Sequence, residues 1–157
     1  MTEPSPGNPP APVRAGLPRR LGAMLYDGLL LLAVLMVATA LFLLLTGGEA
    51  VDPDRTPVLE LVYRLLLLLL IVGFFGLFWT RRGQTLGMAT WRLRVEREDG
   101  RLLGWGDTVR RLAWAIVSLL PIGLGFAWIL VDPEGRAWHD RLSRTRVVLL
   151  PKGTRAG

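Results

Sequence analysis

The stretch LLLLAVLMVATALFLLL, residues 29–45, runs for 17 positions without a charged side chain. Residues 21–26 extend this apolar character toward the N-terminus, across a single interruption at Asp27. A helix needs about 20 predominantly apolar residues to cross the hydrocarbon core of a bilayer. We therefore predict a first membrane-spanning helix over about residues 21–45.

A second apolar block, residues 65–79, also has no charged residue. It reaches the length of a span if residues 59–64 form its outer turn, with Arg64 extending to the membrane interface. We predict a second span over about residues 60–79. Half of the 157 residues are hydrophobic (51%), and the fold class expected is a mainly α, polytopic membrane protein.

A third apolar segment covers about residues 110–131 and has the length of a span, but Pro121, Gly123 and Gly125 interrupt its middle. A break there would let two short helices enter the membrane and return as a re-entrant hairpin. A third full span is the alternative. We favour the hairpin, because a straight span would export a basic C-terminal segment.

Two short segments have the pattern of strands. Residues 91–97 alternate apolar and charged side chains, and residues 145–150 form a β-branched run that ends at Pro151. Neither is stable alone. We expect strands over about residues 90–97 and 144–150 that pair with each other as a small cytoplasmic β element.

The charge distribution predicts the orientation. The loop at residues 46–60 is acidic, whereas residues 81–111 hold eight arginines against four acidic residues. Positive charge in short loops stays in the cytoplasm, so we expect both termini to be cytoplasmic. The remaining divisions predicted are a disordered Pro-rich cytoplasmic lead (1–17), a membrane domain (18–150) and a tail (151–157).

The composition also excludes several function classes. The chain has no cysteine and a single histidine, which rules out thiolate chemistry and multi-histidine metal sites. The net charge is +6, but the arginines flank apolar blocks, as contacts with anionic lipid headgroups require. We expect the lipid bilayer as partner and no nucleic acid. No cofactor, metal or catalytic motif is recognised, and we expect no enzyme.

Asp27 is the main candidate for function, because an ionisable residue inside a spanning helix is costly and is therefore expected to have a functional role. Its position close to the cytoplasmic boundary keeps this cost at the low end. Arg20 lies two helical turns earlier on the same face, about 10 Å away along the axis. Either Asp27 exchanges a proton or a cation, or arginines neutralise it and it only fixes helix packing. Four further arginines are expected at the same depth: Arg81, Arg82, Arg110 and Arg111.

His139 and Asp140 are the one place where the histidine meets a carboxylate. Adjacent residues do not bring imidazole and carboxylate into contact, so a catalytic dyad is not predicted. We expect His139 to be an interfacial or capping residue that supports the site.

Three motifs occur in order: RLGAMLYD at residues 20–27, GQTLG at 83–87, and HDRL at 139–142 before the terminal strand. Together they resemble the RDD family of bacterial membrane proteins over about residues 17–150. The resemblance implies that Arg20, Asp27 and Asp140 are the family's arginine and two aspartates. Met88 departs from it, since relatives often have a lysine there.

The resemblance also implies a bacterial plasma-membrane location and, for some members, transport or sodium/proton exchange. We interpret the chain as a small transport or transport-accessory protein with Arg20, Asp27 and Asp140 clustered at the cytoplasmic mouth. Asp27 would bind and release a proton or monovalent cation while Arg20 sets its pKa. Two spans and a hairpin enclose little volume, so a homo-oligomer or a membrane partner is expected. The alternative is a structural or interaction protein in which the cluster only stabilises helix packing.

Overall fold

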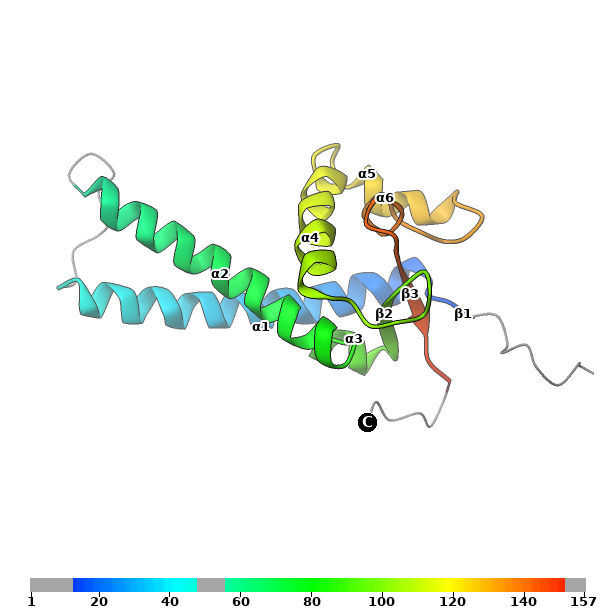
Figure 1. The fold of residues 1–157 in the computed structure, drawn as a ribbon, viewed down its shortest axis with the longest axis horizontal. Helices are drawn as coiled ribbons and strands as arrows, with labels where there is room; N and C mark the ends of the chain where they lie inside the picture. The colour runs from blue at the N-terminus through cyan, green and yellow to red at the C-terminus, as the bar shows by residue number, and fades with distance from the viewer. Residues whose placement is uncertain (1–12, 48–55, 152–157) are drawn as a thin grey trace, which may run out of the picture.

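The computed structural model describes residues 13–47 and 56–151. Two long helices dominate it, α1 (Leu17–Leu45) and α2 (Pro57–Arg81), and both are long and apolar enough to cross a membrane. They pack against each other and form the elongated end of the molecule in Figure 1. The two predicted spans are confirmed, and each helix extends a few residues beyond the predicted range.

The exposed surfaces of these two helices are apolar, as is typical of helices that contact lipid. Large apolar side chains face outward along both, including Leu25 (68% exposed) and Leu69 (69% exposed). A polar contact joins the two helices between their described residues, a 2.9 Å hydrogen bond between the hydroxyls of Thr39 and Tyr63. Their mutual bond satisfies two groups that hydrocarbon could not.

The third apolar segment is broken, as predicted. It consists of α4 (Trp105–Leu119), the short helix α5 (Leu124–Ala127) and the 3₁₀ turn η1 (Trp128–Leu130), with a bend of 106° at the break. Ile122 and Gly123 both have positive φ angles, 55° and 76°, which turn the chain out of the α4 direction. A straight third span is therefore wrong, and the segment begins at residue 105 instead of 110.

The predicted strands pair with each other. β2 (Leu93–Arg97) and β3 (Thr145–Leu149) are antiparallel, with Leu93 opposite Leu149 and Arg97 opposite Thr145. Both strands are shorter than predicted, since α3 includes residue 90 and turns occupy residues 91–92 and 143–144.

A third strand, β1 (Val13–Arg14), pairs with the other edge of β3, giving the order β1-β3-β2. This strand was not predicted, because two residues carry no periodicity that a sequence pattern could reveal. The lead predicted for residues 1–17 is therefore too long at its C-terminal end. Residues 1–12 of that lead and 152–157 of the predicted tail lie outside the described residues.

The sheet decides how the third segment lies. Hydrogen-bonded strands cannot lie on opposite sides of a bilayer, so β1, β2 and β3 share one side. Helices α1 and α2 lead away from this side and back to it. The chain from β2 to β3 must then return to the side where it started, which makes α4, α5 and η1 a hairpin and not a crossing.

The segments before β2 and β3 follow one plan. α3 (Leu86–Thr90) leads into β2 and α6 (Trp138–Leu142) leads into β3. In each case an arginine with positive φ, Arg92 (55°) or Arg144 (54°), makes the turn from helix to strand. A glycine with positive φ precedes each helix at the matching position: Gly83 and Gly135. The strands of the two units are the antiparallel central pair of the sheet.

The apolar core lies where the sheet meets the first turns of α1. Its buried members come from α1, α2, α3, the strands β2 and β3, and the connecting residues Ala15 and Leu103, and α1 packs most closely against α3. The core thus fixes the sheet-side end of both membrane helices against the sheet, and the candidate site lies at this end. The core residues are Ala15, Ala23, Trp79, Met88, Leu93, Val95, Leu103 and Val147.

Candidate functional site

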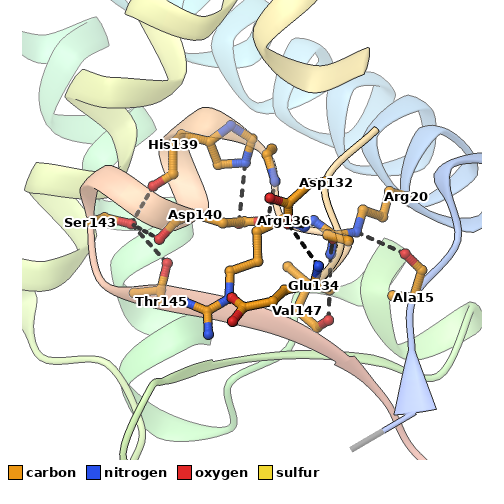
Figure 2. A network of polar contacts seen from close by, with 12 residues as sticks. Ala15, Arg20, Asp132, Glu134, Arg136, His139, Asp140, Ser143, Thr145 and Val147 are labelled. Carbon is orange, nitrogen blue, oxygen red and sulfur yellow. Dashed lines mark hydrogen bonds and ion pairs between the residues drawn. The ribbon is translucent and has the colours of Figure 1, made fainter. Parts of the chain in front are cut away.

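Asp140 lies at the centre of a buried ionic network (Figure 2). Its side chain is fully buried, in the first turn of α6. Oδ2 accepts a hydrogen bond from Arg20 Nη1 at 2.5 Å and from the Ala137 backbone N–H at 3.0 Å, which caps α6. Oδ1 lies 2.6 Å from Arg111 Nη2. One carboxylate therefore connects α1, α4 and α6.

The guanidinium of Arg20 is almost entirely used within the protein. Its Nε donates to the Ala15 carbonyl at 3.1 Å, and its Nη2 donates to the Gly135 carbonyl at 2.9 Å. A longer contact of 3.5 Å reaches the Val147 carbonyl in β3. Arg20 thereby joins the start of α1 to the loop before α6 and to the sheet.

Arg111 holds the other side of Asp140. It is buried on α4, donates a hydrogen bond to the Thr145 hydroxyl, and lies over the Trp79 ring with its guanidinium carbon 5.4 Å from the ring centre. This position satisfies a buried cation with a carboxylate, a hydroxyl and an aromatic face.

We refer to Arg20, Asp140 and Arg111 as the triad; it carries a net charge of +1. Burial by itself would raise the pKa of the Asp140 carboxyl, because it disfavours the charged form. The positive charges of Arg111 and Arg20 outweigh burial and hold that pKa well below its usual range. Asp140 is therefore ionised at any physiological pH.

His139 is buried beside the triad, which corrects the expectation of an interfacial or capping residue. Its ring packs on Phe126 at 4.6 Å, and its Nε2 lies 3.4 Å from Asp140 Oδ1. Burial, followed by the charge of Arg111, lowers the pKa of His139 to about 3, against the opposing effect of Asp140. His139 is thus neutral at physiological pH, and the capping residue of α6 is Asp140.

Asp27 is buried in α1 and binds the start of α3. Its carboxylate accepts a hydrogen bond from the Thr85 hydroxyl and a 2.9 Å bond from the Gly87 backbone N–H. Thr85 in turn caps α3 by accepting from the Met88 N–H at 3.2 Å. A Cβ at Gly87 would lie 2.4 Å from the Ala23 carbonyl oxygen, so glycine is required for this approach. The GQTLG motif therefore supplies the partners of Asp27.

The structure divides the predicted cluster in two. Arg20 and Asp140 bind each other, as the clustering predicts, whereas Asp27 is bound by α3 and not by Arg20. Among the described residues no hydrogen bond or ion pair joins Arg20 to Asp27, the group whose pKa Arg20 is expected to set. The donors of α3 lie against α1 at Asp27, while the Arg20 side chain is bound to the loop before α6.

The supporting arginines have different positions. Arg111 belongs to the triad, and Arg110 binds Asp107 at 2.8 Å and the Ser143 carbonyl at 2.7 Å. Arg81 and Arg82, at the end of α2, are exposed.

Asp27 and the two arginines of the triad line a common cavity of about 240 Å³. Four polar side chains line it, Arg20, Asp27, Arg111 and His139, and the remaining lining is apolar apart from the indole of Trp79. With Asp27 ionised, its charge of −1 balances the +1 of the triad. Within residues 13–47 and 56–151, no three acidic or histidine side chains are grouped so as to hold a metal ion.

Comparison with family models gives one match: the model of the RDD family covers residues 14–144. The chain belongs to the RDD family. The matched range contains α1, α2, the hairpin and all three members of the triad. This RDD family protein, with its two apolar helices, is a membrane protein. Searches of curated proteins and of solved structures return no match.

The full role of Arg111 in this RDD family protein was not predicted, although a signal for it exists. The buried residues of α4 are Thr108, Arg111 and Ser118, which recur at helical spacing and mark one inward polar face. A helix with an apolar outer face and a polar inner face is the reverse of a helix in a soluble protein. Such a pattern indicates a helix whose outer face contacts lipid and whose inner face packs on polar groups. Thr85 and Thr145 were also missed, because a hydroxyl that pairs with a distant charge has no signature in sequence.

Proposed function

We propose that this protein acts in transport, or as an accessory to transport, by exchanging a proton at Asp27. The observation that carries the proposal is the setting of the Asp27 carboxylate. It lies in a membrane helix, lines the cavity, and is held by the neutral donors of Thr85 and Gly87. A buried carboxylate without a direct cationic partner is a suitable proton-exchanging group.

A proton suits this site better than a monovalent cation. Both carboxylate oxygens of Asp27 already accept hydrogens, from Thr85 and Gly87, and these donors repel a metal cation. The arginines that line the same cavity, Arg20 and Arg111, oppose cation entry further. Neutralisation of Asp27 leaves the cavity with the net positive charge of the triad, so proton exchange changes its electrostatic state.

We further propose the bacterial plasma membrane as the location, with the sheet and both termini in the cytoplasm. The sheet side carries exposed arginines, Arg81 and Arg82, and the loop between α1 and α2 is acidic. These arginines are suited to contact anionic headgroups. A path for ions then requires a homo-oligomer or a membrane partner, since two spans and a hairpin enclose little volume.

The alternative is a structural or interaction protein without exchange. The observation that favours it is that Asp27 also joins two elements, since its contacts fasten α1 to the start of α3. In that case the carboxylate need never change its protonation state.

Asp27→Asn separates the two roles. An amide oxygen can accept from the Gly87 N–H, and the amide N–H₂ can donate to the Thr85 oxygen, so the link between α1 and α3 is kept while the titrating group is lost. The purified protein is reconstituted in vesicles loaded with a pH-sensitive dye, and a pH gradient is applied. We expect proton flux in the wild type, loss of flux in Asp27→Asn, and unchanged flux in the exposed control Asp99→Asn. Equal flux in wild type and Asp27→Asn would refute exchange at Asp27, and no flux in the wild type would refute transport by this protein without a membrane partner.

A further inference from the structure

Four buried side-chain polar atoms have no hydrogen-bond partner among the described residues, and two of them belong to residues that line the cavity: the indole Nε1 of Trp79 and the imidazole Nδ1 of His139. The other two are Arg94 Nε and Asp140 Oδ1, whose residues do not line the cavity; Asp140 Oδ1 is held by its ion pair with Arg111. The exposed fractions of Trp79 and His139 are 7% and 6%. An unpaired buried polar atom costs about 1–3 kcal/mol, so native proteins seldom leave one without a partner.

The two atoms require opposite kinds of hydrogen-bond partner, an acceptor for one and a donor for the other. The indole N–H of Trp79 can only donate. His139 is neutral and its Nε2 faces the Asp140 carboxylate at 3.4 Å, which places its hydrogen on Nε2 and leaves Nδ1 as an acceptor. A hydroxyl group both accepts and donates, and so is the simplest chemical group that matches both.

The charges of the cavity favour a ligand without net charge. The triad carries +1 and ionised Asp27 carries −1. The hydrogen-bonding atoms of Asp27 and Arg20 are bound to other parts of the protein. A charged ligand would therefore disturb a balanced set without finding a free partner for its charge.

The size and walls of the cavity define the rest of the ligand. Its volume is about 240 Å³, and an apolar cavity of about 150 Å³ is large enough to hold benzene. Much of the wall is apolar, with rings from Phe75 and Phe126 and aliphatic groups from Ala23 and Leu112. We propose that this cavity binds a small neutral amphiphile, namely a single-ring or short-chain molecule with one hydroxyl group. This inference does not rest on proton exchange at Asp27.

Fluorine NMR with two nearly isosteric probes tests the proposal. 4-Fluorophenol and 4-fluorotoluene are titrated into the full chain in lipid nanodiscs, and empty nanodiscs provide the correction for partition into lipid. We expect saturable binding of the phenol and about tenfold weaker binding of the toluene, the difference that one to two net hydrogen bonds produce. Trp79→Phe and His139→Phe should bring the affinity for the phenol toward that for the toluene.

A pair of glycine variants shows whether binding occurs in this cavity. Gly28 lines it, and a Cβ at this position meets nothing within 4 Å, so Gly28→Phe fills space without a backbone clash. Gly73 in α2 is equally open but does not line the cavity, which makes Gly73→Phe the control. We expect Gly28→Phe to abolish saturable binding and Gly73→Phe to preserve it. Binding that survives Gly28→Phe, equal affinity for both probes, or no saturable binding of the phenol would overturn the proposal.

Discussion

Arg20, in the first turns of α1, donates a 2.5 Å hydrogen bond to Asp140, which lies 120 positions later at the start of α6. Arg111 of α4 holds the second oxygen of the same carboxylate. A single buried anion thus connects the first membrane helix, the hairpin and the helix that follows it. The relative positions of these three elements depend on this anion.

Substitution of Asp140 is expected to destabilise the fold strongly. Asp140→Asn leaves two buried guanidiniums without their counter-charge, and the loss of one partner of a buried ion pair costs about 3–5 kcal/mol. Unfolding of the detergent-solubilised protein, followed by circular dichroism, measures the change. The matched variant Asp99→Asn changes an exposed side chain, so it should change the free energy of unfolding by less than about 1 kcal/mol. Similar losses in both variants would contradict a central role for the triad.

The low pKa of His139 gives stability a specific pH dependence. A histidine with a pKa of about 3 in the folded state stays neutral there, while the unfolded chain binds a proton below pH 6.5. The contribution of His139 to the free energy of unfolding therefore falls as the pH drops from 6.5 toward 3, by about 2 kcal/mol between pH 6.5 and 5. The lowered pKa of Asp140 affects stability in a different pH range, since its stabilising contribution is present above about pH 4 and is lost below.

Denaturant unfolding at a series of pH values measures this slope. His139→Phe keeps the packing on Phe126 and removes the titrating imidazole, so the wild type should lose about 2 kcal/mol more than this variant between pH 6.5 and 5. A slope of the same size in both proteins would show that another group causes it.

Gly87 should tolerate no side chain. Gly87→Ala places a methyl group 2.4 Å from the Ala23 carbonyl oxygen and 2.9 Å from Asp27 Cγ, which forces α3 away from α1. We expect a lower melting temperature for this variant. Gly106→Ala in α4 is the control, because its Cβ meets nothing within 4 Å; alanine there should be neutral or stabilise by up to about 1 kcal/mol. Equal melting temperatures for the two variants would disprove the close approach of α3 to α1.

The hairpin predicts which sites face the same side of the membrane. The chain contains no cysteine, so single cysteines can be introduced and labelled with a membrane-impermeant reagent in oriented vesicles. Cysteines at Glu98, beyond β2, and Glu134, beyond the hairpin, should react from one side, and a cysteine at Thr46 should react from the other. Labelling of Glu134Cys from the Thr46 side would restore a third crossing.

Much of the fold could be predicted from sequence, because lipid imposes strong local rules. The two spans follow from runs of apolar residues, and the break follows from Pro121 and Gly123, which a straight helix does not accommodate well. The pairing of β2 with β3 followed from alternation and from the need of each strand for a neighbour. β1 could not be predicted, since its two residues owe their conformation to the edge of β3.

Three members of the site were predicted, but their contacts were not. Arg20 and Asp27 stand out as charges at the edge of an apolar segment, and Asp140 was identified by the resemblance to the RDD family. Their partners depend on which elements pack together in space, and helical spacing led to pairing Arg20 with Asp27. In the structure Arg20 binds Asp140. Asp27 is bound by Thr85 and Gly87 instead, because α3 packs on α1 beside Asp27.

Proton exchange at Asp27 is tested most directly by infrared difference spectroscopy during a pH titration. A protonated carboxyl group has a C=O stretching band that a carboxylate lacks, and Asp27→Asn identifies the band that belongs to Asp27. Proton exchange at Asp27 predicts a carboxyl band that shrinks as the pH rises through the physiological range, where an exchanging group must lose its proton, and that is absent from Asp27→Asn. A spectrum in this range that is identical for the wild type and Asp27→Asn would contradict the account.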